Sequence, residues 1–265
     1  MTTLLERARR GEPLTNAGII DLHGHLGRVD FPRPDSTADA MVEVMDRVGI
    51  ESVVVSHTRC LYDRPDFGNE EVLAAMQAHP GRILGYVVVH PRSAEWVATE
   101  MTRRVEQGFV GLKLHNANGF PYTDPAYEPA IGIANERRMP VLLHTWGDEA
   151  CMSQVRALAQ EFPEISLLLA HAGAANEEGY VQVAGEFENV YLDVCYSLGP
   201  RGLVERLVAG AGIDKVVFGT DGIFMSITQQ IGKVLGARLS EEDKRKILSE
   251  NARRILGRIK RKDKP

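Results

Sequence analysis

The chain has 265 residues, of which 44% are hydrophobic and 25% charged, and its formal net charge is −5 at pH 7. This is the composition of an ordinary globular protein that can bury a core without disulfides, which excludes disordered and collagen-like chains. A mildly acidic chain is a poor candidate for binding nucleic acid or anionic membranes. No apolar run approaches the roughly 20 residues of a membrane span, and the start lacks the hydrophobic core of a signal peptide. The sequence therefore predicts a cytoplasmic protein that binds neither a membrane nor nucleic acid.

Eight short runs rich in Val, Ile and Leu recur along the chain and predict strands buried on both faces. They span residues 17–23, 51–57, 83–90, 109–115, 140–145, 165–171, 189–195 and 215–221. The segments between them carry apolar residues at helical spacing. Ser36 or Thr37 is the predicted cap of one helix, Asp124 precedes a proline at the start of another, and Ser240 begins a third that stops at Gly257.

Parallel strands need helical crossovers, so about eight alternations of strand and helix predict an α/β fold, the single-domain (β/α)8 TIM barrel. A doubly wound open sheet is the alternative, but no glycine-rich phosphate loop follows the first strand. We expect an N-terminal arm over residues 1–16, the barrel over 17–257 and a basic C-terminal tail over 258–265.

Histidines gather at the predicted strand ends. Six of the eight lie at or just beyond the carboxyl end of a run: His23, His57, His90, His115, His144 and His171. In a barrel all these ends meet at one face, the face that carries the active site in this fold. Any one of these histidines could be a simple capping or hydrogen-bonded residue, but their joint placement indicates a common site.

The most specific element is His23-Gly24-His25. Two residues apart on a strand, both imidazoles point to the same side and can chelate one cation. Together with His144, His171 and Asp221 after later strands, they predict a metal site, because imidazole with one carboxylate suits zinc, iron, manganese or cobalt. The alternative is a polar barrel mouth without metal.

The chain resembles the amidohydrolase superfamily of metal-dependent hydrolases. More narrowly, it resembles the branch that includes aminocarboxymuconate-semialdehyde decarboxylase, γ-resorcylate decarboxylase and related hydrolases. The resemblance spans nearly the whole chain, through IIDLHGH (19–25), GLKLH (111–115), PVLLHT (140–145), LLLAHAG (167–173), VVFGTDG (216–222) and KILSENARRILG (246–257).

This resemblance implies the roles of individual residues. His23, His25, His144 and Asp221 match the metal ligands, and His171 matches a histidine that acts on water or substrate in one-metal members and binds the second ion in two-metal members. One divalent ion is expected, with zinc first and manganese, iron or cobalt as alternatives. Asp221 and His171 are then the expected catalytic residues.

Four further residues are the expected substrate contacts. Lys113 stands where two-metal members carry a carbamylated lysine, and in a one-metal site it is either a contact to a substrate carboxylate or a core-end lysine. His115 faces the same side two residues on. Arg59 and Arg92 lie closest to strand ends among the loop arginines and could form bidentate hydrogen bonds with a carboxylate. Each alone is more often a surface residue that aids solubility. A small, anionic substrate is therefore expected, and a homo-oligomer is left open.

Aromatic residues in these loops could wall the pocket, or could equally be explained by packing: Tyr62, Tyr122, Trp146 and Phe224. Cys195, near the end of the seventh strand, is interpreted as buried filler because nothing nearby in sequence suggests an activated thiolate.

Three functions are compatible with these residues. The first is a metal-dependent hydrolase that uses a metal-activated water on an amide, ester or lactone. The second is a metal-dependent, non-oxidative decarboxylase of an aromatic or unsaturated carboxylic acid, a branch that usually has longer loops than this compact chain. The third is a non-catalytic barrel that only binds a metal or ligand. The ligand set does not separate the first two, and the hydrolase is the expectation taken forward.

Overall fold

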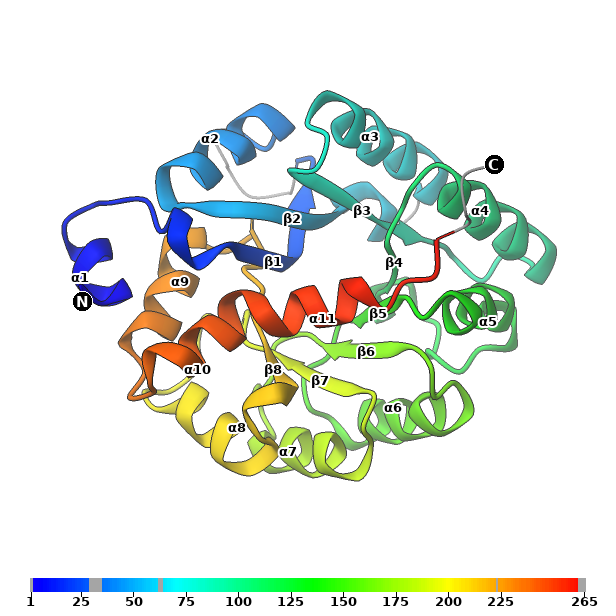
Figure 1. Cartoon of the computed structure of the whole chain (residues 1–265). Helices are drawn as coiled ribbons and strands as arrows, with labels where there is room; N and C mark the ends of the chain where they lie inside the picture. The colour runs from blue at the N-terminus through cyan, green and yellow to red at the C-terminus, as the bar shows by residue number, and fades with distance from the viewer. Residues whose placement is uncertain (1, 29–34, 62–63, 223, 262–265) are drawn as a thin grey trace.

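The computed structural model describes residues 2–28, 35–61, 64–222 and 224–261, and shows the predicted single-domain (β/α)8 barrel (Figure 1). Eight parallel strands follow one another around the barrel in chain order. They are β1 (Ile19–Leu26), β2 (Ile50–His57), β3 (Ile83–Val88), β4 (Gly111–Leu114), β5 (Pro140–Leu143), β6 (Ser166–Leu169), β7 (Val190–Asp193) and β8 (Val216–Val217).

The described helices alternate with these strands and surround them. They are α1 (Leu4–Arg9), α2 (Ala38–Val48), α3 (Pro65–Ala78), α4 (Ala94–Glu106), α5 (Glu128–Arg137), α6 (Glu149–Glu161), α7 (Glu177–Glu186), α8 (Leu203–Ala211), α9 (Ile227–Gly236), α10 (Glu241–Arg245) and α11 (Asn251–Gly257). Thr37 caps α2 and Ser240 caps α10, as predicted, whereas Asp124 caps a short 3-10 turn that precedes α5. Across the described residues, none of the helices is both long and apolar enough to cross a membrane.

The barrel closes between β8 and β1 through the chain that continues beyond β8. The Leu22 N–H donates to the Phe218 carbonyl at 3.0 Å, and the Asp221 N–H donates to the His23 carbonyl at 2.7 Å. The His25 N–H donates to the Gly222 carbonyl at 2.5 Å. These bonds bring the two ends of the sheet together and set Asp221 directly beside the His23-Gly24-His25 segment.

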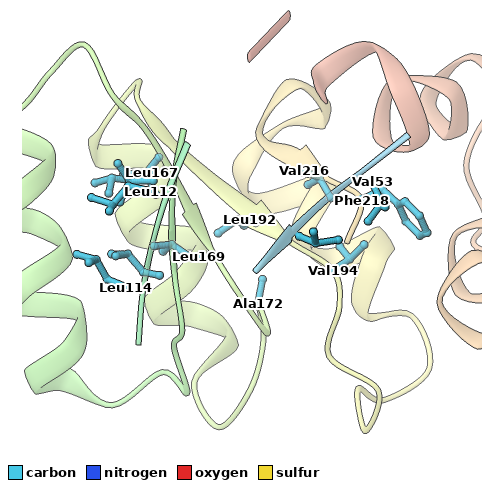
Figure 2. Packing of buried hydrophobic residues seen from close by; sticks show 14 of the residues in the cluster. Val53, Leu112, Leu114, Leu167, Leu169, Ala172, Leu192, Val194, Val216 and Phe218 are labelled. Atoms are coloured by element: carbon cyan, nitrogen blue, oxygen red, sulfur yellow. The ribbon is translucent and has the colours of Figure 1, made fainter. Parts of the chain in front are cut away.

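Two apolar layers hold the barrel. The outer layer lies between strands and helices, and Figure 2 shows part of it, with Leu112 and Leu114 of β4 and Leu167 and Leu169 of β6. The inner layer takes residues from around the barrel, such as Val54, Leu142 and Val217, together with Ala252 and Ile255 of α11. Figure 1 shows α11 lying across one end of the barrel. The helix covers this end of the barrel, and the histidines lie at the carboxyl ends of the strands.

A β-bulge in β1 sets the direction of the metal-site histidines. Ile20 and Leu22 belong to the inner layer, yet Leu26 belongs to the outer one, so the two-residue alternation changes phase between them. The pairing with β2 shows the cause, because Asp21 and Gly24 pair with Val53 and Val55, which leaves one extra residue on β1. Without this extra residue His23 and His25 would face the helices rather than the interior.

Candidate metal centre

Three side chains from the joined ends of β1 and β8 converge on one point. The Nε2 atoms of His23 and His25 are 3.2 Å apart, and the Asp221 Oδ1 atom lies 3.5 Å from the first and 3.1 Å from the second. All three residues are buried. Two ligand atoms that each lie about 2.0–2.1 Å from one zinc ion at ordinary bond angles would themselves be about 3 Å apart, which matches this spacing.

The other ring nitrogens of the two histidines are already satisfied. His23 Nδ1 lies 2.7 Å from Asp193 Oδ2, and His25 Nδ1 lies 3.0 Å from Ser56 Oγ. The carboxylate can only accept, so His23 carries its proton on Nδ1, and the same arrangement is the natural one for His25 against the serine oxygen. Their Nε2 lone pairs therefore face each other and the Asp221 carboxylate. In this tautomer three acceptor atoms converge on one point, an arrangement that fits a bound cation.

Asp193 and Ser56 were not among the site residues that the sequence predicted. Both are buried polar residues at the ends of otherwise apolar strands, which is the one signal that could have found them. Burial raises the pKa of Asp193 to about 6, so the carboxylate stays ionised at neutral pH. Such hydrogen-bond partners of metal-binding histidines fix the tautomer and ring orientation.

Replacing Asp193 with Asn is therefore expected to weaken divalent-metal binding about 10–100-fold. The amide removes the acceptor charge that holds His23 in the tautomer with a free Nε2. Competition with a chromogenic chelator measures the affinity. Asp214→Asn, which removes one exposed carboxylate elsewhere, is the control. Equal affinities for the two variants would contradict this role of Asp193.

Lys113 projects from β4 into the same cluster. Its side chain is fully buried, and Nζ lies 3.3 Å from His23 Nε2. Burial lowers the pKa of Lys113 to about 8, against the opposing effect of the Asp221 carboxylate. The lysine therefore brings an ionisable amine to the edge of the candidate metal centre.

Asp221 and His171 share an unusual backbone conformation. Their φ angles are +54° and +57°, in the left-handed region that residues other than glycine rarely adopt. Such residues cost about 1–3 kcal/mol each and concentrate at functional sites. Burial alone would raise the pKa of Asp221, but His23 and His25, when they are protonated, lower it well below its ordinary value by their charge and by a hydrogen bond from His25. These groups therefore favour the carboxylate form of Asp221.

His171 lies on the opposite side of the Asp221 carboxylate. Its Nε2 atom is 4.0 Å from Asp221 Oδ2 and 3.3 Å from His144 Nδ1. The Trp146 indole stacks on its ring, with centroids 4.5 Å apart and planes within 3°. His171 is thus in the cluster, but its nitrogen lies farther from Asp221 than those of His23 and His25.

His144 and His115 extend the cluster outward. Their rings stack with centroids 3.9 Å apart, and both are half-buried. Burial lowers the pKa of His115 to about 3 and that of His144 further, so both are neutral in this environment. His144, expected as the fourth metal ligand, contacts His171 and not the three converging ligand atoms directly.

The two predicted arginines lie farther out and are exposed. The Arg59 guanidinium lies over the Phe67 ring at 5.3 Å, and that of Arg92 over the Trp96 ring at 5.7 Å. The structure therefore brings Lys113 and His115 to the histidine cluster and shows these arginines against aromatic rings of α3 and α4.

Of the predicted pocket walls, Trp146 and Phe224 lie against site histidines, and Phe224 meets the His25 ring edge-on at 5.0 Å. Tyr122 is buried and donates from its hydroxyl to the His144 carbonyl at 2.5 Å. Tyr62 lies outside the described residues. A groove of about 900 Å³ lies between the N-terminal arm, α2 and α9, and none of the predicted site residues lines it. The candidate metal centre is therefore identified by the geometry of its ligand atoms and not by this groove.

The family model described as amidohydrolase matches residues 20–258. The γ-resorcylate decarboxylase of Polaromonas sp. (strain JS666 / ATCC BAA-500) is 22% identical. The match runs over 312 aligned positions and covers 91% of this chain and 95% of that protein.

Two solved structures share the fold. Dihydroxybenzoic acid decarboxylase from Polaromonas sp. JS666, with bound manganese and the inhibitor 2-nitroresorcinol, matches with a TM-score of 0.71 and 19% identity, over 91% of this chain and 97% of that one. 5-Carboxyvanillate decarboxylase from Sphingomonas paucimobilis matches with a TM-score of 0.72 and 14% identity, over 91% and 99%.

The expectation of a hydrolase acting on an amide, ester or lactone is wrong, because these relatives are decarboxylases. The ligand set alone could not separate the two reactions, since both need a bound cation beside an acid–base group. Loop length does not decide between the two reactions, because this shorter chain still matches nearly the whole length of these decarboxylases. With the family model matching about nine-tenths of its length, the chain belongs to the amidohydrolase family.

Proposed function

We propose that this protein is a metal-dependent, non-oxidative decarboxylase of a hydroxylated aromatic carboxylic acid. The similarity to γ-resorcylate decarboxylase over 91% of the chain carries the proposal. The buried cluster of His23, His25 and Asp221, with His171 facing it, supplies a ligand set and a proton-handling group for this chemistry.

We assign the ion to His23, His25 and Asp221, with His144 as the fourth ligand. A bound divalent ion would supply the positive charge that attracts the phenolic and carboxylate oxygens of such a substrate. Zinc is the ion expected from the ligand types, and manganese is the ion bound in the related dihydroxybenzoic acid decarboxylase. One ion per chain is expected, with Lys113 unmodified.

Asp221 is the proposed carrier of the transferred proton. As a carboxylate, Asp221 has no proton of its own to give, so the proton arrives with the substrate, and a phenolic hydroxyl next to the substrate carboxylate can supply it. Asp221 then returns this proton to the ring carbon that bears the carboxylate. The carbon–carbon bond breaks, its electron pair restores the aromatic ring, and carbon dioxide leaves. The product phenolate regains a proton from water, so no oxidant is needed.

The remaining site residues bind and orient. His171 donates its Nε2 hydrogen to a substrate oxygen, an interaction that can strengthen as charge develops. The buried ammonium of Lys113 offsets the negative charge of the substrate carboxylate, and the faces and edges of His115, Trp146 and Phe224 suit a planar ring. Arg59 and Arg92 are proposed as outer contacts that attract the anion.

Carbon dioxide release tests the proposal directly. Metal-stripped protein is loaded with zinc or with manganese and incubated, without oxygen, with 2,6-dihydroxybenzoate, 5-carboxyvanillate and unsubstituted benzoate. We expect turnover of at least one hydroxylated acid and none of benzoate, which has no hydroxyl proton to give. Stoichiometric binding of metal without carbon dioxide release from any hydroxylated acid would favour the non-catalytic barrel and overturn the proposal.

A further inference from the structure

The end of β7 places two residues against two different histidines of the site. Asp193 contacts Nδ1 of His23, as described above, and Cys195 Sγ lies 3.4 Å from Nδ1 of His171. The Cys195 N–H donates to Asp193 Oδ1 at 3.1 Å, which joins the two partners into one unit. One histidine therefore faces a carboxylate, and the other faces a thiol.

The hydrogen bonds of the Cys195 thiol indicate which nitrogen of His171 holds the proton. The His171 N–H donates to Cys195 Sγ at 3.2 Å, so the sulfur already accepts one hydrogen. Cys195 is fully buried, and burial raises the pKa of its thiol well above the ordinary value, so the S–H hydrogen is retained. Its described partner is Nδ1 of His171, and donation to that nitrogen requires Nδ1 to be unprotonated.

The contact at the opposite nitrogen is consistent with this assignment. His171 Nε2 and His144 Nδ1 lie 3.3 Å apart, a hydrogen-bond contact that needs one proton between them. If Nδ1 of His171 accepts from the thiol, Nε2 carries the hydrogen and donates to His144, and a bound substrate oxygen would accept this hydrogen in place of His144. The contacts then form one consistent chain from Cys195 through His171 to His144.

We infer that Cys195 is a positioning residue that holds His171 as the Nε2–H tautomer, so that this histidine donates a hydrogen bond to the substrate and does not bind the metal. The inference rests on the proposed function, since it gives His171 its part in that reaction. It also explains why two histidines of one cluster take opposite roles. The carboxylate of Asp193 leaves His23 with a free Nε2 lone pair, whereas the thiol of Cys195 leaves His171 with a hydrogen at Nε2.

Two other contacts hold the ring so that this hydrogen has a fixed direction. Trp146 stacks flat on one face of the imidazole, and the left-handed backbone of His171 fixes where the side chain leaves the chain. The tautomer therefore decides whether Nε2 of His171 presents a hydrogen or a lone pair to the site.

Imidazole ¹⁵N shifts of ¹⁵N-histidine-labelled protein, loaded with zinc because it is diamagnetic, report the tautomer without substrate. His171→Asn assigns the signals. In the wild type, Nδ1 of His171 should give the shift of an unprotonated nitrogen and Nε2 that of a protonated one. A protonated Nδ1, or the shift of a zinc-bound Nε2, would overturn the inference.

Two variants separate this role from packing. Cys195→Ser keeps one donor and one acceptor, and should keep the Nε2–H tautomer and most of kcat. Cys195→Ala removes both, and should give mixed tautomers and a kcat lower by about 10-fold or more, with KM changed little and zinc content unchanged. An Ala variant with wild-type tautomer and kcat would contradict the inference. Because the ¹⁵N signature needs no turnover, a failure of the decarboxylation assay would leave this result readable by itself.

Discussion

His171→Asn is expected to keep most of the bound metal and to lower the turnover of a hydroxylated aromatic acid about 10²–10⁴-fold. The three ligand atoms that converge belong to His23, His25 and Asp221, while His171 Nε2 stands 4.0 Å from the nearer oxygen of Asp221. Loss of the imidazole therefore removes a hydrogen-bond donor beside the substrate. It does not remove a member of the converging set.

The matched variant is His144→Asn, which should lose metal and activity together if His144 is the fourth ligand. Metal content is measured by elemental analysis of both purified variants, and turnover is measured by carbon dioxide release. A His171→Asn protein that loses its metal as completely as His144→Asn would make His171 a ligand. Two ions bridged by a carbamylated Lys113 in the wild type would likewise contradict the single-ion assignment.

Glu100→Gln is expected to lower the free energy of unfolding by about 3 kcal/mol, because it leaves a buried cation without its buried partner. The side chain of Arg104 is fully buried between α3 and α4, and its guanidinium donates from Nε to Glu100 Oε1 at 2.6 Å. The same oxygen accepts from Asn69 Nδ2 at 3.0 Å, and Asn69 also bonds the backbone of Val88 in β3. One carboxylate thus connects two helices and a strand.

Urea denaturation and thermal unfolding measure this change, and for a chain of this size the melting temperature should fall by roughly 6–12 °C. Glu70→Gln is the control, because Glu70 pairs with the same guanidinium at 2.9 Å but is half exposed. Its loss should cost no more than about 1 kcal/mol. The double variant Glu100→Met/Arg104→Met, which removes both charges, should recover much of the loss. Equal destabilisation by Glu100→Gln and Glu70→Gln would contradict this account.

The sequence determined the barrel and the strand ends at which its chemistry sits. Eight apolar runs separated by helical segments leave few architectures open, because buried parallel strands need helical crossovers. Residues at strand ends then share one face regardless of their separation in the chain. For this reason the sequence alone predicts that His23, His25, His171 and Asp221 share one site.

The sequence could not determine which way those side chains face or what stands behind them. Simple alternation along β1 would have turned His23 and His25 toward the helices, and the bulge that turns them inward is visible only in the pairing with β2. Ser56, Asp193 and Cys195 come from other strands, and no spacing in the chain links them to the rings they contact.

Only the tertiary structure therefore decided the hydrogen-bond partner of each histidine. That partner sets which ring nitrogen keeps the proton, and so which ring can bind a cation and which can donate to a substrate. The residue types in the sequence were sufficient to predict a metal site, because imidazole and carboxylate are metal ligands wherever they meet. Which of these side chains binds a cation and which donates to a substrate depends on contacts between strands far apart in the chain. These contacts form only when the barrel closes.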